Sequence, residues 1–299
     1  MIDPARVLAH PGLEVPYRYD TRETMLHGLA TGIGMDPMDT DRLVFGYEDL
    51  AGPGQALQAL PTLPIVLGWV DLVRDPRSWD AALGIDPHRV VVGQTAMTLH
   101  RPVPVAGEGT TRSFFMDLVD KGPGRGALVL ARREVRDATA GLLATVDTWL
   151  FVRGAGGFGG QPAGGPPAVE IPARAPDAVV DQPTSGQAAL LYRLMLRDHN
   201  AVHADPAYAL RAGFDKPILH GLATFSMAIH SAMAGTTGAL AGHAGRFRTA
   251  QARMVSPVFP GDTLHTEAWQ GARGEVLFRT TVPARGATVI DAGRLALHT

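Results

Sequence analysis

The sequence predicts an α+β protein built from two similar halves, and three observations support this. A stretch rich in glycine and proline interrupts the 299-residue chain near its middle. Short motifs recur in the same order before and after that stretch. In each half, an apolar segment precedes runs in which apolar and polar residues alternate, as in strands with one buried face. The expected architecture is an antiparallel sheet wrapped around a helix, formed twice.

The central stretch sets the predicted domain boundaries. Residues 153–167 read RGAGGFGGQPAGGPP, a composition that can neither hold a helix nor present an apolar face. Further prolines follow as far as Pro183. We therefore predict a linker over residues 153–183, between an N-terminal domain (1–152) and a C-terminal domain (184–299).

The repeat rests on three motifs in the same order in both halves. A Tyr-Arg pair comes first, a proline that opens an apolar run second, and a proline pair in a short turn third. The same number of residues separates Pro61 from Pro104 as separates Pro217 from Pro260. Three matches in one order indicate a duplication within the chain.

The elements of each half follow from periodicity. Residues 222–235, LATFSMAIHSAMAG, are apolar on all sides and free of proline, which predicts a buried helix. Alternating runs bounded by glycine then predict three antiparallel strands in each half. These runs are residues 111–122, 127–137 and 141–152 in the first half, and 263–274, 275–286 and 288–299 in the second.

Composition excludes several classes of function. The net charge of −2 lacks the basic excess of a nucleic-acid-binding protein. The chain has no cysteine, which excludes disulfides, thiolate catalysis and cysteine-ligated zinc. It also has neither an uninterrupted apolar run long enough to span a membrane nor a recognisable signal peptide, so we expect a cytoplasmic protein.

The segment RDHNAVHADP, residues 197–206, is the candidate site. Asp198 and His203 lie five positions apart, so they would not share one face of a continuous helix. If a helix ends near Arg197, a turn can bring both side chains to one point. Asp205 before Pro206 predicts the capped start of a further helix. Taken alone, this composition is more typical of a capped turn than of an active site, and the spacing disfavours a metal site.

A second motif changes that balance. His220 and Gly221 open the predicted buried helix, and the first N–H groups of a helix lie at the positive end of its dipole. Such groups can stabilise a carbonyl oxygen as it becomes an oxyanion. The structural alternative is that His220 contributes to the helix cap and that Gly221 permits close packing. Together the two segments would supply an acid–base pair and an anion site.

Residues 192–225, YRLMLRDHNAVHADPAYALRAGFDKPILHGLATF, resemble the signature of the MaoC-like, hydratase-2 group of (R)-specific enoyl-CoA hydratases. The segments FGYED, LPTLPIVLG, QTAMTLHRPVPVAG and PVFPGDTLHTEAW resemble their counterparts in two-half members of this group. Two departures stand out: the group's Asn-Pro-Leu-His is Asn200-Ala201-Val202-His203 here, and Met195-Leu196-Arg197 replace small residues before the aspartate. The resemblance implies a double hot-dog fold.

The resemblance also implies an activity, the reversible hydration of trans-2-enoyl-CoA to (R)-3-hydroxyacyl-CoA. Asp198 and His203 would hold one water as base and acid, and Asn200 would orient the water or the pair. The N–H of Gly221 would donate to the thioester oxygen. No metal and no redox cofactor is expected, and CoA enters as part of the substrate.

The first half lacks the motif. Near the equivalent place it has Glu23 and His27 without Asp-x-Asn-x-x-His, so we expect it to shape the acyl pocket rather than to react. The runs Leu60–Val70 and Phe225–Met233 are candidate pocket walls, although plain core is the favoured alternative. Candidate ligands of the CoA phosphates are Arg246 and Arg248, expected on one strand face, and Arg253; ordinary surface arginines are the alternative.

Several alternatives stay open at this point. The substrate could be a 3-hydroxyacyl group on acyl-carrier protein, or a branched or dicarboxylic CoA ester. A hot-dog thioesterase or a non-catalytic acyl-CoA-binding subunit would share the fold. A double hot-dog chain already resembles a dimer, so a homodimer is one open option for its assembly.

Overall fold

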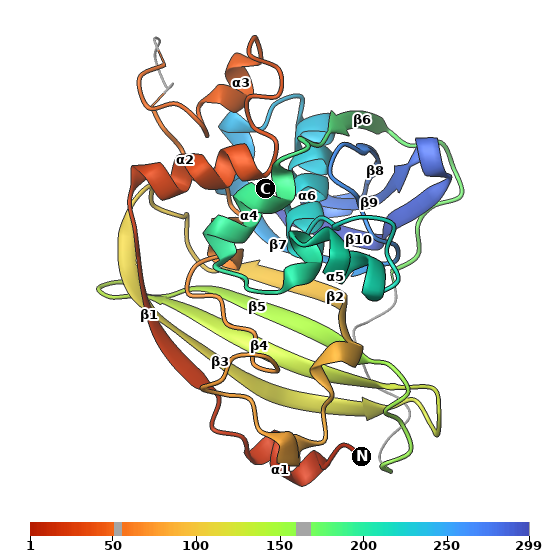
Figure 1. Ribbon diagram of the computed structural model, residues 1–299. Coiled ribbons are helices and arrows are strands. Elements are labelled where there is room, and N and C mark those ends of the chain that lie inside the picture. Colours follow the sequence, from red (N-terminus) through yellow and green to blue (C-terminus); the bar gives the residue numbers. More distant parts are fainter. Residues whose placement is uncertain (51–55, 160–168, 299) are drawn as a thin grey trace.

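The computed structural model describes residues 1–50, 56–159 and 169–298. Its strands form one ten-stranded antiparallel sheet in the order β1-β3-β4-β5-β2-β7-β10-β9-β8-β6 (Figure 1). The strands of the first half are β1 (Leu13–Tyr19), β2 (Val90–Leu99), β3 (Gly107–Asp120), β4 (Ala127–Asp137) and β5 (Gly141–Val152). Those of the second half are β6 (Ala178–Pro183), β7 (Phe247–Met254), β8 (Thr263–Gln270), β9 (Glu275–Val282) and β10 (Ala287–Leu297).

The duplication is visible in the topology. From its outer edge inward, the first half runs first, third, fourth, fifth and second strand, and the second half repeats this order from the opposite edge. The two half-sheets meet where β2 pairs with β7, from Gln94 opposite Arg253 to Thr98 opposite Thr249. The three strands predicted in each half correspond to β3–β5 and β8–β10, and two further strands per half complete the sheet.

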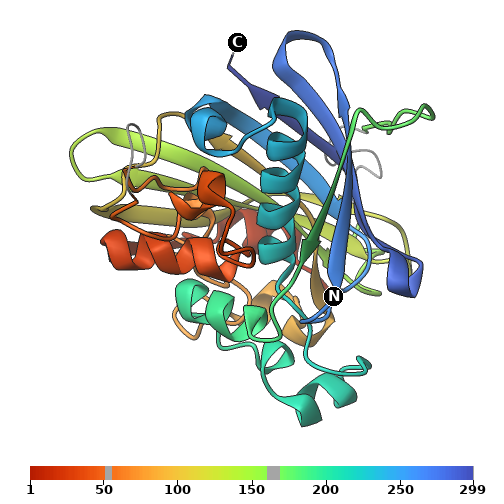
Figure 2. The same ribbon diagram turned by 90° about the horizontal axis from the view of Figure 1, so that it is seen from above.

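One long helix, α6 (Gly221–Thr237), forms the centre of the second half as predicted. Residues 222–233 are all buried, because strands β6, β8, β9, β10 and β7 of the second half pack against this helix (Figure 2). The helix ends at Gly238, which takes up the left-handed conformation that glycine allows at φ 80°. The remaining helices are α1 (Pro4–Ala9), α2 (Thr21–Ala30), α3 (Thr40–Leu43), α4 (Ala188–Leu196) and α5 (Pro206–Arg211).

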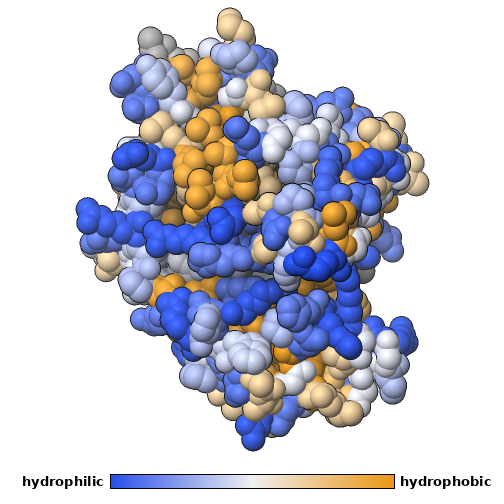
Figure 3. All heavy atoms as spheres, viewed as in Figure 1, coloured by the Kyte–Doolittle hydropathy of each residue, from blue (hydrophilic) through white to orange (hydrophobic). Residues whose placement is uncertain are grey.

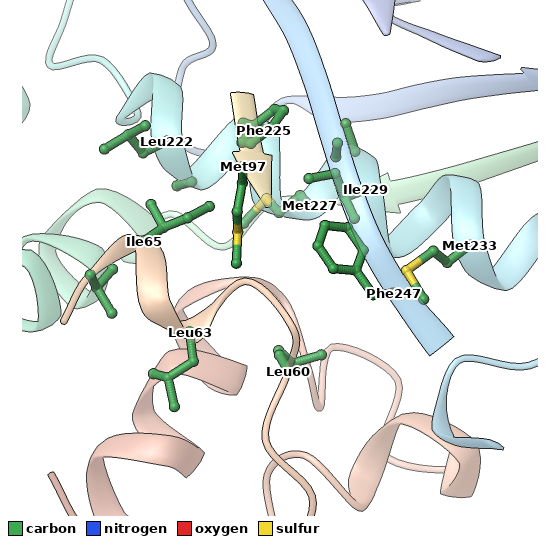
Figure 4. Close-up of a cluster of buried hydrophobic side chains, with 14 of the residues drawn as sticks. Leu60, Leu63, Ile65, Met97, Leu222, Phe225, Met227, Ile229, Met233 and Phe247 are labelled. Atoms are coloured by element: carbon green, nitrogen blue, oxygen red, sulfur yellow. The ribbon is translucent and has the colours of Figure 1, made fainter. Parts of the chain in front are cut away.

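Among the described residues of the first half, no helix is equivalent to α6, so the prediction of one buried helix per half is wrong there. The run from Leu60 to Val70 forms only a short 3-10 turn, Leu63–Ile65. Pro61 and Pro64 cannot donate backbone hydrogen bonds, and proline disrupts the interior of an α-helix. Leu60, Leu63, Ile65, Val66 and Leu67 of this run are nevertheless buried in the central core, the larger of two apolar clusters, part of which Figure 4 shows.

The predicted linker is also too long at its end. Residues 178–183 form strand β6, which pairs with β8 and closes one edge of the sheet. At the other end of the stretch, Gly157 and Gly159 each donate an N–H to Asp120 at 2.8 Å, which ties this segment to the end of β3. Residues 160–168 of the predicted linker lie outside the described residues.

A second apolar cluster covers another part of the first half-sheet. This N-terminal core consists of Ile2, Val7, Leu72, Val73, Leu83, Ile85, Val90, Phe115, Ala127, Val129 and Val152. Along β4, Val129 belongs to the N-terminal core and Val135 to the central core. Alternation puts Ala131 and Arg133 on the same face between them. The inner face of β4 thus passes from one core to the other with an arginine in between.

A buried polar contact ties the two halves together. The Thr62 hydroxyl lies 3.1 Å from Nε2 of His27 on α2 and 2.8 Å from Nε2 of His230 on α6. All three residues are fully buried. Burial lowers the pKa of His27 to about 3 and lowers the pKa of His230 well below its usual value. Both imidazoles are therefore neutral in the folded protein at neutral pH.

An apolar patch lies on the surface over α2 and α4 (Figure 3), and these helices contact each other. Leu29, Leu190 and Leu194 are all exposed there. Within the described residues, no helix combines the length and apolar character needed to cross a membrane.

Acidification should destabilise this protein through its buried histidines. The unfolded chain takes up protons as the pH falls below about 6.5, while the folded His27 resists protonation down to about 3. The free energy of unfolding should therefore decrease by about 2 kcal/mol per such histidine between pH 7.5 and 5. Urea unfolding at both pH values measures this. His27→Gln should reduce the pH dependence, and an unchanged dependence in His27→Gln and His230→Gln would contradict the prediction.

Candidate active site

The turn after α4 carries the predicted acid–base pair. Helix α4 ends at Leu196, and Arg197 adopts the left-handed conformation at φ 55°, which redirects the chain. Asn200 then caps a 3-10 turn, Ala201–His203, through its Oδ1, which accepts the N–H of Val202 at 3.3 Å. Asp205 caps α5 as expected. The predicted turn between two helices is confirmed.

Asp198, His203 and His220 form one compact cluster. The Oδ2 atom of Asp198 lies 3.7 Å from Nε2 of His203 and 3.5 Å from Nε2 of His220. The two imidazole rings stack, with centroids 3.7 Å apart and planes inclined by 19°. Asp198 and His220 are buried, at 7% and 3% exposure. Three groups capable of proton transfer thus share a site largely shielded from bulk water.

The hydrogen bonds of His203 decide which of its nitrogens carries the proton. Its Nδ1 lies 2.9 Å from the carbonyl oxygen of Ile218, which can only accept a hydrogen bond. In the neutral ring, Nδ1 therefore holds the hydrogen and Nε2 presents a lone pair. A lone pair and a carboxylate oxygen cannot bond to each other directly, but a water between them can donate to both.

The charges of the cluster follow from its surroundings. Burial by itself raises the pKa of Asp198, but the His220 ring, the N–H of Asn200 and His203 outweigh it, so this pKa lies below its usual value. Burial, followed by the proximity of His220, lowers the pKa of His203 to about 3. At neutral pH the site therefore contains an ionised carboxylate and a neutral imidazole, two groups that can both accept a proton.

The same three side chains place potential metal-ligand atoms within 4.8 Å of one another. A ligating imidazole directs its lone pair in the plane of its ring. Because the rings of His203 and His220 are stacked, their lone pairs run side by side rather than converging on one ion. The geometry suits a hydrogen-bonded water better than a metal.

Gly221 is the first residue of α6, and its position fits the predicted anion site. His220 is the N-cap residue, but its side chain makes no cap hydrogen bond, so the first N–H groups of the helix keep their hydrogens available. Gly221 lines the cavity that also contains His203 and His220. A Cβ at Gly221 would meet Cγ of Met254 at 3.4 Å, close to an ordinary contact, so packing by itself does not demand glycine here.

Two cavities reach Asp198. The inner cavity has a volume of about 380 Å³ and is lined by Asp198, Asn200, His203, His220 and Gly221. The outer cleft has a volume of about 1690 Å³ and also reaches Asp198 and Asn200. The four catalytic candidates chosen from the sequence, Asp198, Asn200, His203 and Gly221, therefore all line one cavity.

The three arginines predicted to bind CoA phosphates line neither cavity. Arg246 ends a 3-10 turn before β7 and donates from Nε to the carbonyl of His298 at 2.9 Å. It therefore does not share a strand face with Arg248, contrary to expectation. Arg248 and Arg253 are exposed on β7. Their assignment to CoA stays a prediction.

The candidate pocket walls divide between core and cavity. Phe225, Met227, Ile229 and Met233 belong to the central core, so the core alternative is correct for them (Figure 4). Within Leu60–Val70, the first part is core while Trp69 and Val70 line both cavities. The sequence did not reveal that the His220 ring stacks on His203. The His-Gly motif had drawn attention to His220, but only as the residue before the helix.

Sequence comparisons agree with this geometry. The MFE-2 hydratase 2 N-terminal domain matches residues 17–154, and the MaoC like domain matches residues 168–291. The 3-hydroxyacyl-thioester dehydratase Y of Mycobacterium tuberculosis is 36% identical, over 93% of this chain and 92% of that protein. The peroxisomal enoyl-CoA hydratase 2 of Arabidopsis thaliana is 33% identical, over 95% and 92%.

The chain belongs to the MaoC-like hydratase 2 family. Solved structures support the fold. A MaoC-like dehydratase from Phytophthora capsici aligns with a TM-score of 0.83 at 29% identity, covering 99% of this chain and 98% of that one. A more distant Mycobacterium tuberculosis protein, described as having a double hot-dog fold, aligns at 0.56 with 19% identity over 96% of each chain. The predicted double hot-dog architecture of this family member is confirmed.

His220→Phe tests whether the stacked ring tunes Asp198. Phenylalanine keeps a flat ring but loses the interaction that lowers the pKa of Asp198. We expect kcat/KM for enoyl-CoA hydration to fall about 10-fold, and the loss of activity on acidification to begin at a higher pH. The pH profile of kcat/KM measures both. His265→Phe, on a surface histidine paired with Asp181, is the matched control; identical profiles for both variants would rule out this role.

Proposed function

We propose that this chain catalyses the reversible hydration of trans-2-enoyl-CoA to (R)-3-hydroxyacyl-CoA as a carbon–oxygen lyase. The observation that carries the proposal is the pair formed by Oδ2 of Asp198 and Nε2 of His203, 3.7 Å apart, beside the N-terminus of α6 in one cavity. Relatives named as enoyl-CoA hydratase and hydroxyacyl-thioester dehydratase, each matching nearly the whole chain, support it.

In the proposed reaction, one water sits between Asp198 and His203. Its oxygen adds to C3 of the enoyl group as the pair accepts a proton from it, and a proton is returned to C2. No net proton is gained or lost. Electron density moves to the thioester oxygen in the transition state, and the N–H of Gly221 donates to this oxygen there. Loss of such a donor typically costs about 2.7–4 kcal/mol of transition-state stabilisation.

Asn200 has a narrower role than the sequence suggested. Its Oδ1 accepts the N–H of Val202, so one lone pair of this oxygen is engaged in the turn, and the amide N–H groups remain to orient the water or the carboxylate. The main-chain N–H of Asn200 already donates to Oδ1 of Asp198 at 2.8 Å. We propose that Asn200 mainly holds the turn so that Oδ2 of Asp198 faces His203.

The first half is proposed to shape the acyl pocket without reacting. Trp69, Val90, Ala131 and Leu150 from this half line the inner cavity. His27 lies near the place in the first half that is equivalent to the Asp-x-Asn-x-x-His motif. Its side chain is fully buried against Thr62. It therefore cannot hold a water at a substrate.

The reaction as written requires neither a metal nor a redox cofactor, since only water is added or removed. A cytoplasmic location, a role in fatty-acid metabolism and homodimer formation are further proposals. The exposed apolar patch over α2 and α4 is the surface that would suit a homodimer. Acyl-carrier protein is the alternative carrier, and comparing kcat/KM for crotonyl-CoA with that for the crotonyl carrier-protein thioester separates the two.

Asp198→Asn and His203→Gln should each lower crotonyl-CoA hydration at least about 100-fold. Each removes one of the two proton acceptors that hold the water, while keeping a side chain of similar size. The measurement is the loss of absorbance of the conjugated enoyl thioester, with thermal unfolding to confirm that each variant is folded.

Free thiol should be assayed in parallel. Thiol release without hydration would indicate a thioesterase, and acyl-CoA binding with neither reaction would indicate a binding subunit. Full hydration activity in both folded variants would contradict the assignment of Asp198 and His203 as the groups that hold the water.

A further inference from the structure

Arg133 is a buried cation at the wall of the inner cavity. It lies on β4, is only 6% exposed, and occupies the inner face between the central and N-terminal cores. Its neighbours across the sheet are Ser113 on β3 and Val146 on β5, and both also line the cavity. The catalytic steps described above do not use it.

The guanidinium is only partly satisfied by the protein. Its Nη2 donates to the carbonyl oxygens of Pro64 and Ile65, which hold the turn that replaces a helix in the first half. Its Nε and Nη1 atoms are buried and have no hydrogen-bond partner among the described residues. A guanidinium has five N–H donors, so most of its donor capacity is unused.

The positive charge of Arg133 also lacks a counterion. In the part of the chain that the structure describes, no carboxylate oxygen lies within salt-bridge distance of it. The adjacent Arg132, by contrast, bonds both carboxylate oxygens of Asp147, at 2.7 and 2.6 Å. Burial lowers the pKa of Arg133 to about 10, so it stays charged at neutral pH. An uncompensated buried charge is costly, so a ligand that supplies a counterion would stabilise it.

We propose that Arg133 binds a carboxylate carried by the acyl chain, so that the preferred substrates are short trans-2-enoyl-CoA esters, or the corresponding 3-hydroxyacyl esters, with an acidic group at the distal end. This inference rests on the proposed function and names its substrate class. The thioester end is assigned to Gly221 on α6, whereas Arg133 lies on the first-half wall beside Ala131 and Val146, where the acyl chain would lie. A charge-assisted hydrogen bond to a carboxylate would supply the missing counterion.

The size of the inner cavity fits this assignment. Its volume of about 380 Å³ is near the lower end of the range for small-molecule pockets. A long alkyl chain would need more apolar space and would leave the guanidinium unpaired. A short chain that ends in a carboxylate would fill the cavity and satisfy Arg133 at once.

The test compares trans-2-hexenedioyl-CoA with trans-2-hexenoyl-CoA, which have the same chain length and differ only in the terminal carboxylate. The wild type should show at least about a 10-fold higher kcat/KM for the carboxylated ester. Arg133→Met should lose about 10- to 100-fold on the carboxylated ester and keep its activity on hexenoyl-CoA. Arg133→Lys, which restores the charge, should recover part of the preference.

Arg279→Met is the matched control. Arg279 lies on β9, the second-half counterpart of β4, is paired with Glu267 and lines neither cavity, so this variant should change neither activity. Equal turnover of the two esters by the wild type, or an equal loss on both in Arg133→Met, would overturn the proposal and leave Arg133 as a support for the Pro64–Ile65 turn.

A binding experiment on the wild type covers the case in which Arg133→Met does not fold. Adipoyl-CoA and hexanoyl-CoA are saturated, cannot be hydrated, and differ only in the carboxylate; calorimetry should give at least about a 10-fold lower Kd for adipoyl-CoA. Equal Kd values would overturn the proposal. Tighter binding of adipoyl-CoA, with no hydration of either enoyl ester, would support the Arg133 site and reject the hydratase function.

Discussion

The pairing of β2 with β7 is the constraint on which the rest of this structure depends. It joins two half-sheets of the same strand order into one sheet and so fixes the first half as a wall beside the active turn of the second. The inner cavity is lined from both sides of this junction, by Trp69 and Ala131 as well as by Asp198 and His203. Because residues of both halves line the cavity, neither half alone would enclose the site and shield Asp198 and His203 from bulk water.

The two halves share a topology but have diverged where the chemistry occurs. In the second half, α6 starts at the candidate active site, and Gly221 and Leu222 of its first turn line the inner cavity. In the first half, Pro61 and Pro64 prevent the equivalent helix, and the chain forms a short turn instead. Arg133 donates from its Nη2 to this turn and lines the inner cavity.

Buried polar groups are distributed by role. His27 and His230 are neutral, and their Nε2 atoms meet at the Thr62 hydroxyl, so they stabilise the contact between halves. His203 is neutral as well, but its Nδ1 is held by a carbonyl so that Nε2 faces Asp198. The same side chain thus serves as a structural tie in one place and as a proton acceptor in another. Burial lowers the pKa of His27, His203 and His230 alike. Their different roles therefore follow from their different hydrogen-bond partners.

Local sequence determined a large part of this protein. Alternation predicted β3–β5 and β8–β10, apolar composition predicted α6, and the spacing of Asp198 and His203 around a capped turn predicted their approach. These features depend on residues close together in the chain, so periodicity and capping preferences are sufficient to identify them. The short edge strand β6 was hidden because its signal lay within a proline-rich stretch.

Only the tertiary structure decided which distant residues meet. The stacking of His220 on His203 depends on how α6 docks against the turn, and the position of Arg133 beside the same cavity depends on the junction of the half-sheets. Likewise, the sequence suggested three arginines as ligands of the CoA phosphates, yet Arg246, Arg248 and Arg253 line neither cavity that reaches Asp198. Residue type and spacing specify the chemical groups and their local geometry, whereas long-range packing specifies which groups share a cavity.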